Sequence, residues 1–204
     1  MNWIPLDEQV KALNVATLLG RWRSGTPEWH EARKGIGGSE VGAICGVNPW
    51  KTPEMVLAAK LGHEEPMVPN LAMKLGTHFE APIRRLWKEE NEAFLECYDT
   101  GTWQHIAQPT WKANPDGLIR WNDGTLGVLE IKYTARKWTS VPDYYRYQVL
   151  WYMHVLGLRK GILVQCVGHT LQEWTIDYDE NELQEITATV LAFEDDLLRR
   201  QNGI

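Results

Sequence analysis

Apolar residues in the first ninety positions recur every three or four residues, which is the spacing of amphipathic helices. Between residues 6 and 19 they include Val10, Leu13 and Ala16, and the pattern stops at Gly20, so one helix is predicted there. The other helices predicted in this half cover residues 28–34, residues 39–45 with Ser39 as the N-cap, residues 52–62 behind Thr52-Pro53, and residues 70–91 with Asn70 as the N-cap. The glycines before Ser39 are expected to allow a close backbone approach, and Pro82 is expected to weaken the long helix.

From residue 93 onward the pattern changes to short runs rich in β-branched and aromatic residues. Turn-forming residues separate these runs, at Asp99-Thr100-Gly101 and at Asn122-Asp123-Gly124. The predicted strands cover residues 94–98, 103–107, 116–121, 126–133, 161–167 and 171–178. A helix is predicted from Pro142 to residue 156, where Gly157 ends it, and a last one from the cap Asp179 to about residue 200.

The order of these elements predicts an α+β fold, since helices come first and a meander of strands, a helix, two strands and a final helix follow. The central β-sheet is expected to be mixed and flanked by helices. No internal repeat, low-complexity tract or long linker interrupts the sequence. Residues 1–204 are therefore predicted to form a single domain.

The overall charge does not indicate a nucleic-acid partner, because the formal net charge is −6. Basic residues occur instead as local pairs, at Arg33-Lys34, Arg84-Arg85, Arg136-Lys137, Arg159-Lys160 and Arg199-Arg200. Each pair alone is typical of a solvated surface, so a DNA-binding chain of this charge must gather its positive side chains where the strand lies. The eleven tryptophans are spread along the sequence, which is typical of core or interface anchors rather than of a base-stacking array.

Several other classes of protein are disfavoured. The three cysteines lack CxxC spacing and the six histidines lack HxH or HExxH spacing, which weighs against disulfide and zinc sites. No basic segment followed by an apolar one opens the chain, and no apolar run is long enough for a membrane helix. We therefore expect a soluble, cytoplasmic protein with no membrane partner.

The stretch from Asn114 to Lys132 holds the most informative polar residues. Asp116 opens one predicted strand, and Glu130 and Lys132 lie two residues apart on the next. Because side chains alternate faces along a strand, Glu130 and Lys132 point the same way. The turn at residues 122–124 would bring Asp116 beside them, so that two carboxylates and an ammonium share one small space. Such an arrangement is typical of a divalent-cation site.

Charged residues at strand ends are common, so this spacing alone is a weak signal. The position of Glu130 within the apolar run Val128-Leu129-Glu130-Ile131 strengthens it, because a buried charge is costly unless it is paired or bound to a metal. The alternative is a surface ion pair between Glu130 and Lys132 on an amphipathic strand. The apolar flanks favour the functional interpretation.

Four motifs in a fixed order resemble one family of nucleases. They are GIGGSEVGAICG at residues 35–46, GTHFE at 76–80, NPDG and LEIK between 114 and 132, and YYRYQVLWYMHVLG at 144–157. Together they resemble the lambda exonuclease family, also called YqaJ-type viral recombinases, within the PD-(D/E)xK nuclease superfamily. The resemblance extends over roughly residues 28–167 and implies a restriction-endonuclease-like core.

The resemblance implies roles for residues at matching positions. Asp116 and Glu130 match the family's metal-binding carboxylates, and the main-chain carbonyl of Ile131 matches a further ligand. Lys132 matches the catalytic lysine that is held near the attacking water. Glu80 matches a helical glutamate that supports the metal site directly or through water.

Three further residues are implicated in the same way. Gln148 matches the glutamine that completes the catalytic core, while Arg33 and Ser39 match residues that bind the 5′-phosphate of the DNA. Each also has a structural alternative: Arg33 could neutralise the C-terminal end of its short helix, Ser39 could be a cap alone, and Gln148 could be an exposed helix residue. Glu80 could likewise pair with Arg84, four residues along the helix.

By resemblance, the chain is expected to be an Mg²⁺-dependent, processive 5′→3′ exonuclease. It would act on linear double-stranded DNA, release 5′-mononucleotides and leave 3′ single-stranded tails for recombination. One or two ions are expected, with Mn²⁺ as a substitute for Mg²⁺. Family members are rings of three around duplex DNA, so a homotrimer is expected, and enclosure would make an acidic surface tolerable. The expected partner is a phage single-strand annealing protein in a bacterial host cell.

Two other functions stay open at this stage. One is an endonuclease of the same superfamily, of the restriction or repair kind. The other is a non-catalytic protein that binds DNA ends and has kept the fold. The intact set of Asp116, Glu130 and Lys132 weighs against the second.

Overall fold

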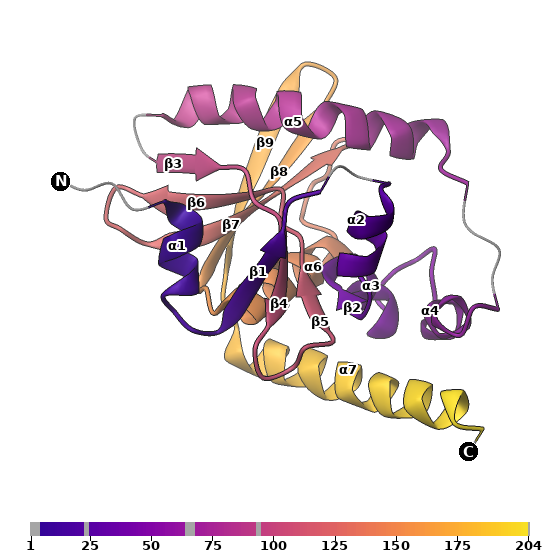
Figure 1. Ribbon diagram of the computed structural model, residues 1–204. Helices are drawn as coiled ribbons and strands as arrows, with labels where there is room; N and C mark the ends of the chain where they lie inside the picture. Colours follow the sequence, from indigo (N-terminus) through magenta and orange to yellow (C-terminus); the bar gives the residue numbers. More distant parts are fainter. Residues whose placement is uncertain (1–4, 23–24, 64–67, 93–94, 204) are drawn as a thin grey trace.

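The computed structural model describes residues 5–22, 25–63, 68–92 and 95–203. Two mixed β-sheets with helices packed around them make up the fold (Figure 1). One sheet has the strand order β3-β6-β7-β8-β9 and the other has the order β1-β4-β5-β2. The predicted α+β class is confirmed, although the single mixed sheet that the sequence suggested is divided into two.

The five-stranded sheet carries the central stretch of the sequence. Its strands are β3 (Leu95–Tyr98), β6 (Gly117–Trp121), β7 (Leu126–Tyr133), β8 (Lys160–Val167) and β9 (Thr170–Asp177). Strands β7 and β8 are parallel and are joined through the helix α6 (Asp143–Leu156), whereas the other neighbours are antiparallel. The turn between β6 and β7 is the predicted one: Gly124 has a φ of +88°, and its N–H donates to the Trp121 carbonyl over 2.9 Å.

The four-stranded sheet corrects the prediction for the N-terminal region. Its strands are β1 (Ala16–Gly20), β4 (Thr102–His105), β5 (Trp111–Ala113) and β2 (Ile36–Gly37). A single helix over residues 6–19 is wrong, because α1 (Leu6–Lys11) ends early, the chain turns at Asn14 with a φ of 55°, and β1 pairs with β4. Strand pairing overrides the helical spacing there. The strands β2 and β5 have two and three residues, too few for their periodicity to be recognised.

Five further helices lie in the part of the chain that the structure describes. They are α2 (Pro27–Ala32), α3 (Gly38–Ile44), α4 (Pro53–Lys60), α5 (Leu71–Asn91) and α7 (Glu180–Gln201). Helix α5 continues through Pro82. Part of the loop predicted at residues 63–70 lies outside the described residues. So does the first residue of the strand predicted at residues 94–98.

The start of α3 also differs from the prediction. Ser39 is not the N-cap, because the helix begins at Gly38 with Gly37 before it, and the Glu40 carboxylate accepts a hydrogen bond from the Gly37 N–H over 3.0 Å. The close backbone approach predicted for these glycines is confirmed. A Cβ atom on Gly38 would lie 2.5 Å from Cε1 of Tyr152, which explains how α3 packs directly on α6.

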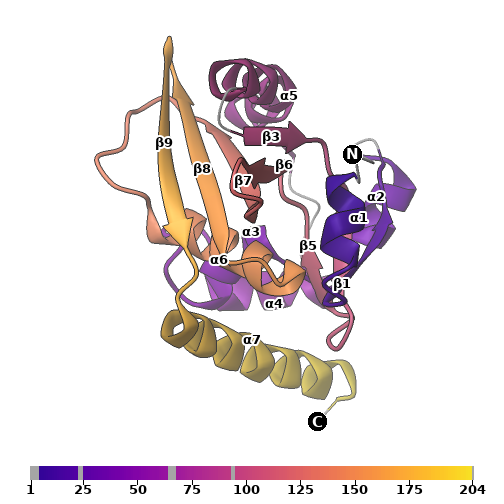
Figure 2. The same cartoon turned by 90° about the vertical axis from the view of Figure 1, so that its left-hand side faces the viewer.

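Helices α5 and α6 pack against opposite faces of the five-stranded sheet (Figures 1 and 2). Leu129 and Ile131 of β7 pack with Ile83 and Trp87 of α5, whereas Val128 packs in the cluster that contains α6. Because side chains alternate along a strand, Glu130 and Lys132 share the face of Val128. The strand therefore directs both polar side chains towards α6.

Most tryptophans anchor the core, as predicted. Of the ten in the described residues, four are buried and five are half-buried. Trp50 is the exception, since 70% of it is exposed. Within the described ranges, no helix is both long and apolar enough to cross a membrane.

Candidate active site

The site begins where strands β6 and β7 separate. Their ladder runs as far as the pair Gly117 and Leu129. Two residues beyond it, the Ile131 N–H donates instead to Oδ2 of Asp116 over 2.7 Å. The N–H and C=O of one strand residue point to the same edge, so the Ile131 carbonyl also faces the gap that contains Asp116. The hairpin thus brings Asp116 to the end of β7 that carries Glu130.

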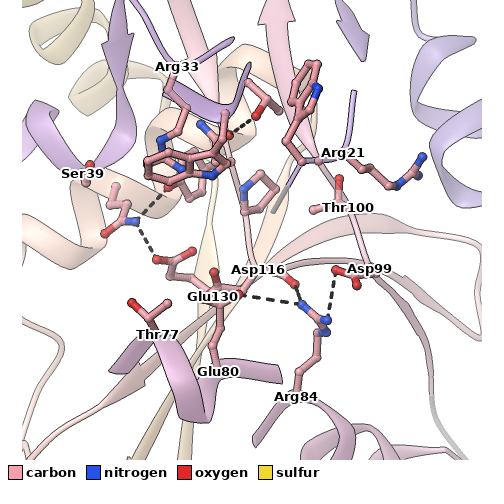
Figure 3. Close-up of a pocket in the computed structure, with 18 of the residues that line it drawn as sticks. Arg21, Arg33, Ser39, Thr77, Glu80, Arg84, Asp99, Thr100, Asp116 and Glu130 are labelled. Carbon is pink, nitrogen blue, oxygen red and sulfur yellow. Dashed lines mark hydrogen bonds and ion pairs between the residues drawn. The ribbon is translucent and has the colours of Figure 1, made fainter. Parts of the chain in front are cut away.

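All seven side chains for which the sequence predicts a role line one cavity of about 600 Å³. Figure 3 labels five of them: Arg33, Ser39, Glu80, Asp116 and Glu130. All seven come from six parts of the chain: the end of α2, helices α3, α5 and α6, the start of β6, and β7. The seven are Arg33, Ser39, Glu80, Asp116, Glu130, Lys132 and Gln148. Residues separated by more than a hundred positions therefore meet in one place, and their chemical roles remain predictions.

Glu130 is held by polar groups on one side only. It is 2% exposed, and its Oε1 accepts from Lys132 Nζ over 2.5 Å and from Gln148 Nε2 over 2.6 Å. Gln148 also donates to the hydroxyl of Tyr152 over 2.9 Å. Oε2 of Glu130 is buried and has no hydrogen-bond partner among the described residues. The alternatives of a surface pair for Glu130 and an exposed position for Gln148, which is 5% exposed, are wrong.

Burial and mutual repulsion make the carboxylates hard to ionise. Burial, followed by the charge of Glu80, raises the pKa of Asp116 to about 7. Burial, followed by the charge of Asp116, raises the pKa of Glu130 to about 8. Burial alone would lower the pKa of Lys132, but the carboxylates of Glu130 and Asp116 outweigh it and hold that pKa above its ordinary value. The ammonium therefore stays protonated while the acids are poised near neutral pH.

This donor set fits a divalent cation. The unpartnered oxygen of Glu130, the Asp116 carboxylate and the Ile131 carbonyl are oxygen ligands of the kind that Mg²⁺ prefers. No group of three or more His, Cys, Asp or Glu side chains in the described ranges is placed to hold a metal by itself. Mg²⁺ commonly binds through one or two carboxylates and keeps several waters, so two carboxylates with a carbonyl suit it.

Helix α5 adds Glu80 and a cation that the sequence analysis did not assign to the site. Arg84 donates from Nη1 to the Asp116 carbonyl over 2.5 Å, and its Nη2 lies 3.0 Å from Oδ1 of Asp99. Its Nη1 is 4.0 Å from Glu80, so the alternative pairing at i,i+4 exists but is long. Burial, and then the charge of Glu130, raises the pKa of Glu80. The sequence signals for Arg84 were its place in a basic pair and its i,i+4 spacing from Glu80, and neither pointed to Asp116.

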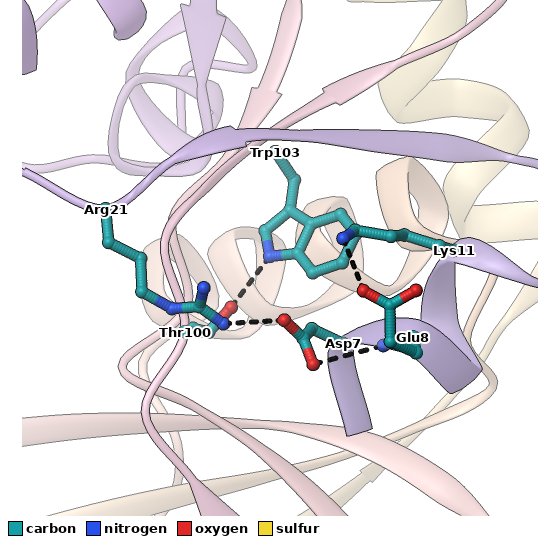
Figure 4. Close-up of polar contacts among 6 residues, drawn as sticks. All are labelled: Asp7, Glu8, Lys11, Arg21, Thr100 and Trp103. Carbon is teal, nitrogen blue, oxygen red and sulfur yellow. Dashed lines mark hydrogen bonds and ion pairs between the residues drawn. The ribbon is translucent and has the colours of Figure 1, made fainter. Parts of the chain in front are cut away.

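The opposite wall of the cavity is basic and aromatic. Arg33 follows the last residue of α2, and its guanidinium carbon lies 4.4 Å from the centre of the Trp29 ring. This position is compatible with both predicted uses, at the helix end and in the cavity. Ser39 lies exposed in the first turn of α3. Arg21 also lines the cavity, and its Nη2 donates to Oδ2 of Asp7 of α1, outside the cavity lining, over 2.9 Å (Figure 4).

Comparison with known proteins finds one family that matches most of the chain. The profile of the YqaJ-like viral recombinase domain matches residues 28–159. The uncharacterized protein YqaJ of Bacillus subtilis (strain 168) is 28% identical over 183 residues, which are 83% of this chain and 55% of that protein. The chain thus spans about half the length of this curated relative.

Solved structures share the fold. An alkaline exonuclease from Laribacter hongkongensis superposes with a TM-score of 0.68 at 23% identity, covering 87% of this chain and 98% of its own. The same enzyme in complex with dAMP gives a TM-score of 0.71 at 22% identity, with the same coverage. A phage-related exonuclease from Haemophilus somnus 129PT gives 0.61 at 12% identity, covering 82% of this chain and 96% of its own. With its profile match over more than half the sequence, the chain belongs to the YqaJ-like viral recombinase domain family.

Proposed function

We propose that the chain is a metal-dependent nuclease that hydrolyses DNA at the cavity around Glu130. The observation that carries this proposal is the buried, unpartnered Oε2 of Glu130 beside Asp116. Leaving such a group without a partner costs about 1–3 kcal/mol, more if it is charged, and a bound cation would offset that cost. The solved exonucleases that share the fold support the same activity.

The chain's own groups account for the catalytic steps. Asp116, Glu130 and the Ile131 carbonyl would hold Mg²⁺ or Mn²⁺, as one ion or two, and the ion when bound polarises the phosphate and lowers the pKa of water. Lys132, protonated and adjacent to Glu130, donates to the attacking water and stabilises the charge that grows on the phosphate. Gln148 fixes Glu130 in place, and Glu80 supports the site from α5.

The basic wall supports a preference for a 5′ end. Arg33 offers a planar fork that matches a terminal phosphate, and Ser39 offers a hydroxyl in the same cavity. A 5′-phosphate bound there would set the first phosphodiester near the carboxylates. The proposed activity is therefore 5′→3′ exonucleolytic digestion of linear duplex DNA, releasing 5′-mononucleotides and leaving 3′ single-stranded tails.

Two further parts of the proposal concern assembly. A homotrimeric ring around the duplex would make digestion processive without a basic outer surface, in keeping with the net charge of −6. A single-strand annealing protein would then receive the 3′ tails. Native mass spectrometry tests the ring directly, and a monomer would remove the argument from enclosure.

Digestion of end-labelled linear duplexes tests the activity and its polarity. Duplexes with a 5′-phosphate should release labelled 5′-mononucleotides from the 5′ end with Mg²⁺, and EDTA should stop the release. Covalently closed circular DNA should stay intact. Cutting of the circle would instead favour the endonuclease, and end binding without hydrolysis would favour the non-catalytic protein.

A further inference from the structure

A second cavity, of about 540 Å³, takes no part in the proposed chemistry. Residues 134–140 of the loop between β7 and α6 line it, together with Tyr144 and Tyr145 of α6 and with Trp50, which precedes α4. Figure 2 shows this loop projecting on the left of the view, beside β9. The lining combines aromatic rings with basic side chains, which is unusual on a chain of net charge −6.

The aromatic rings form a row that ends in solvent. Trp50 meets Tyr144 at 5.2 Å between ring centres with an interplanar angle of 78°, and Tyr144 meets Tyr145 at 4.3 Å. Trp138 continues the row, at 5.1 Å from Tyr145. The edge-to-face contact supports the Trp50 ring, which stays 70% exposed to solvent. An exposed, supported ring of this kind is a stacking platform for an unpaired base.

The basic side chains beside this row are held outward. Arg136 and Lys137 are exposed, and within the described residues neither forms an ion pair. The fully buried Gln165 of β8 fixes their loop: it donates to the Arg136 carbonyl over 2.8 Å and accepts from the Trp138 N–H over 3.1 Å. A loop fixed in advance binds a ligand with less loss of conformational entropy.

A third cavity, of about 350 Å³, shares lining residues with both of these cavities. Asp116 and Lys132 line both the catalytic cavity and the third one, and Tyr145 lines both the third and the aromatic one. Lys132 Nζ lies 4.9 Å from the centre of the Tyr145 ring. The aromatic cavity therefore lies next to the catalytic one, with Tyr145 at the boundary.

We propose that the aromatic cavity, bounded by Trp50, Arg136, Lys137, Trp138 and Tyr144, is a binding site for single-stranded DNA next to the catalytic centre. Bases stack on Trp50, and the phosphates on either side of them meet Arg136 and Lys137. The proposal rests on the proposed function in one respect, because it takes DNA as the substrate. It adds a site that holds unpaired nucleotides while the catalytic cavity acts on the end.

Fluorescence anisotropy with a labelled oligothymidylate tests the site in EDTA, where hydrolysis cannot occur. Trp50→Ala and the double variant R136E/K137E should each weaken binding by about tenfold, the size expected for one stacked base or two phosphate contacts. The matched control is K11E/R159E, which makes the same change of charge. Arg159 follows the far end of α6, a helix of 14 residues and thus about 20 Å long.

The outcomes separate this proposal from the proposed function. The proposed DNA site would be wrong if both cavity variants bound the oligothymidylate with wild-type affinity. It would also be wrong if K11E/R159E lost as much affinity as they did. The cavity would then bind a partner of another kind. Circular dichroism checks that each variant is folded. Trp50, Arg136 and Lys137 are exposed, so the two variants test stacking and charge separately. One result would separate the two proposals: the wild-type protein releases no nucleotide, yet both variants bind the oligothymidylate more weakly than the wild type does. In that case the DNA site stands and the nuclease proposal fails.

Discussion

Two ion pairs in this molecule both have short N–O distances but differ in their exposure to solvent. On α7, Arg200 lies 3.0 Å from Asp196, and the two side chains are 55% and 48% exposed. On β7, Lys132 lies 2.5 Å from Glu130, and the side chains are 20% and 3% exposed. Water screens the first pair, whereas the second is removed from water and leaves one carboxylate oxygen without a partner.

The difference teaches that the contact distance says little about what an ion pair does. The α7 pairs stabilise the helix surface slightly, and their charges are balanced within each pair. Around Glu130, the carboxylates of Asp116 and Glu80 add negative charge that Lys132 and Arg84 do not remove, since the pKa values of all three acids stay raised. This excess of negative charge in a buried cluster supports the proposed cation site.

The largest expected effect comes from breaking the buried cluster. Asp116→Ala and Lys132→Ala should each lower the rate of nucleotide release from a linear duplex by about 10³-fold or more, because each removes a charged group from the proposed catalytic centre. Single-turnover digestion at saturating protein measures this rate. Release at the wild-type rate by either variant would refute the assignment of the active site.

A second effect should appear in the stability of the metal-free protein. The folded-state pKa of Asp116 is about 7 against an ordinary value of 3.8, so between these pH values the folded state binds more protons than the unfolded state. Asp116 therefore lowers stability progressively as the pH rises through this window. Asp116→Asn should remove that loss, which is on the order of 2–4 kcal/mol, and raise Tm at pH 8 by roughly 5–10 °C.

Thermal unfolding in EDTA at pH 4.5 and pH 8 measures this gain. It should be small at pH 4.5, which lies only just above the ordinary pKa of 3.8, and large at pH 8, which lies above the folded-state pKa of about 7. A gain that is the same at both pH values would contradict the raised pKa of Asp116.

A smaller effect is expected at the basic wall. Arg33→Ala should reduce the preference for 5′-phosphorylated over 5′-hydroxyl duplex ends by about tenfold, because the planar fork to the terminal phosphate is lost. Lys34→Ala is the matched control, since Lys34 lies next in sequence but its side chain is 73% exposed and pairs with Glu31. An equal loss of preference in both variants would show that general positive charge, not Arg33, selects the end.

The smallest effect should come from the exposed pairs on α7. Arg199→Ala together with Arg200→Ala should change the free energy of unfolding by less than about 1 kcal/mol, because exposed pairs at i,i+4 contribute little. Urea unfolding measures this change, and nucleotide release should be unaltered. A loss comparable with that of the buried cluster would undermine the contrast between the two settings.

Much of the fold and of the site could be predicted because the signals are local. The turn at residues 122–124, the two-residue spacing of Glu130 and Lys132, and the glycines of residues 35–38 each depend on near neighbours in sequence. Resemblance to a family then located Glu80, Gln148, Arg33 and Ser39, which the structure brings to the same cavity.

Features that depend on distant contacts could not be predicted. Strand β1 forms because β4 is available to pair with it, and nothing within residues 6–19 signals that partner. Arg84 enters the site through the main-chain carbonyl of Asp116, 32 residues away, a contact that leaves no pattern in sequence. Ser39 fails as a cap because α3 begins at Gly38, with Gly37 as its N-cap, and Gly38 is held in close contact with Tyr152 of α6.

The account's central claim is that the buried carboxylates form a cation site, and calorimetric titration with Mn²⁺ at pH 7.5 tests it most directly. The wild-type protein should bind one or two ions and release protons on binding, because Asp116 and Glu130 must ionise fully. Asp116→Asn and Glu130→Gln should each weaken the affinity at least about tenfold. Equal affinity in all three proteins, with no proton release, would contradict the claim.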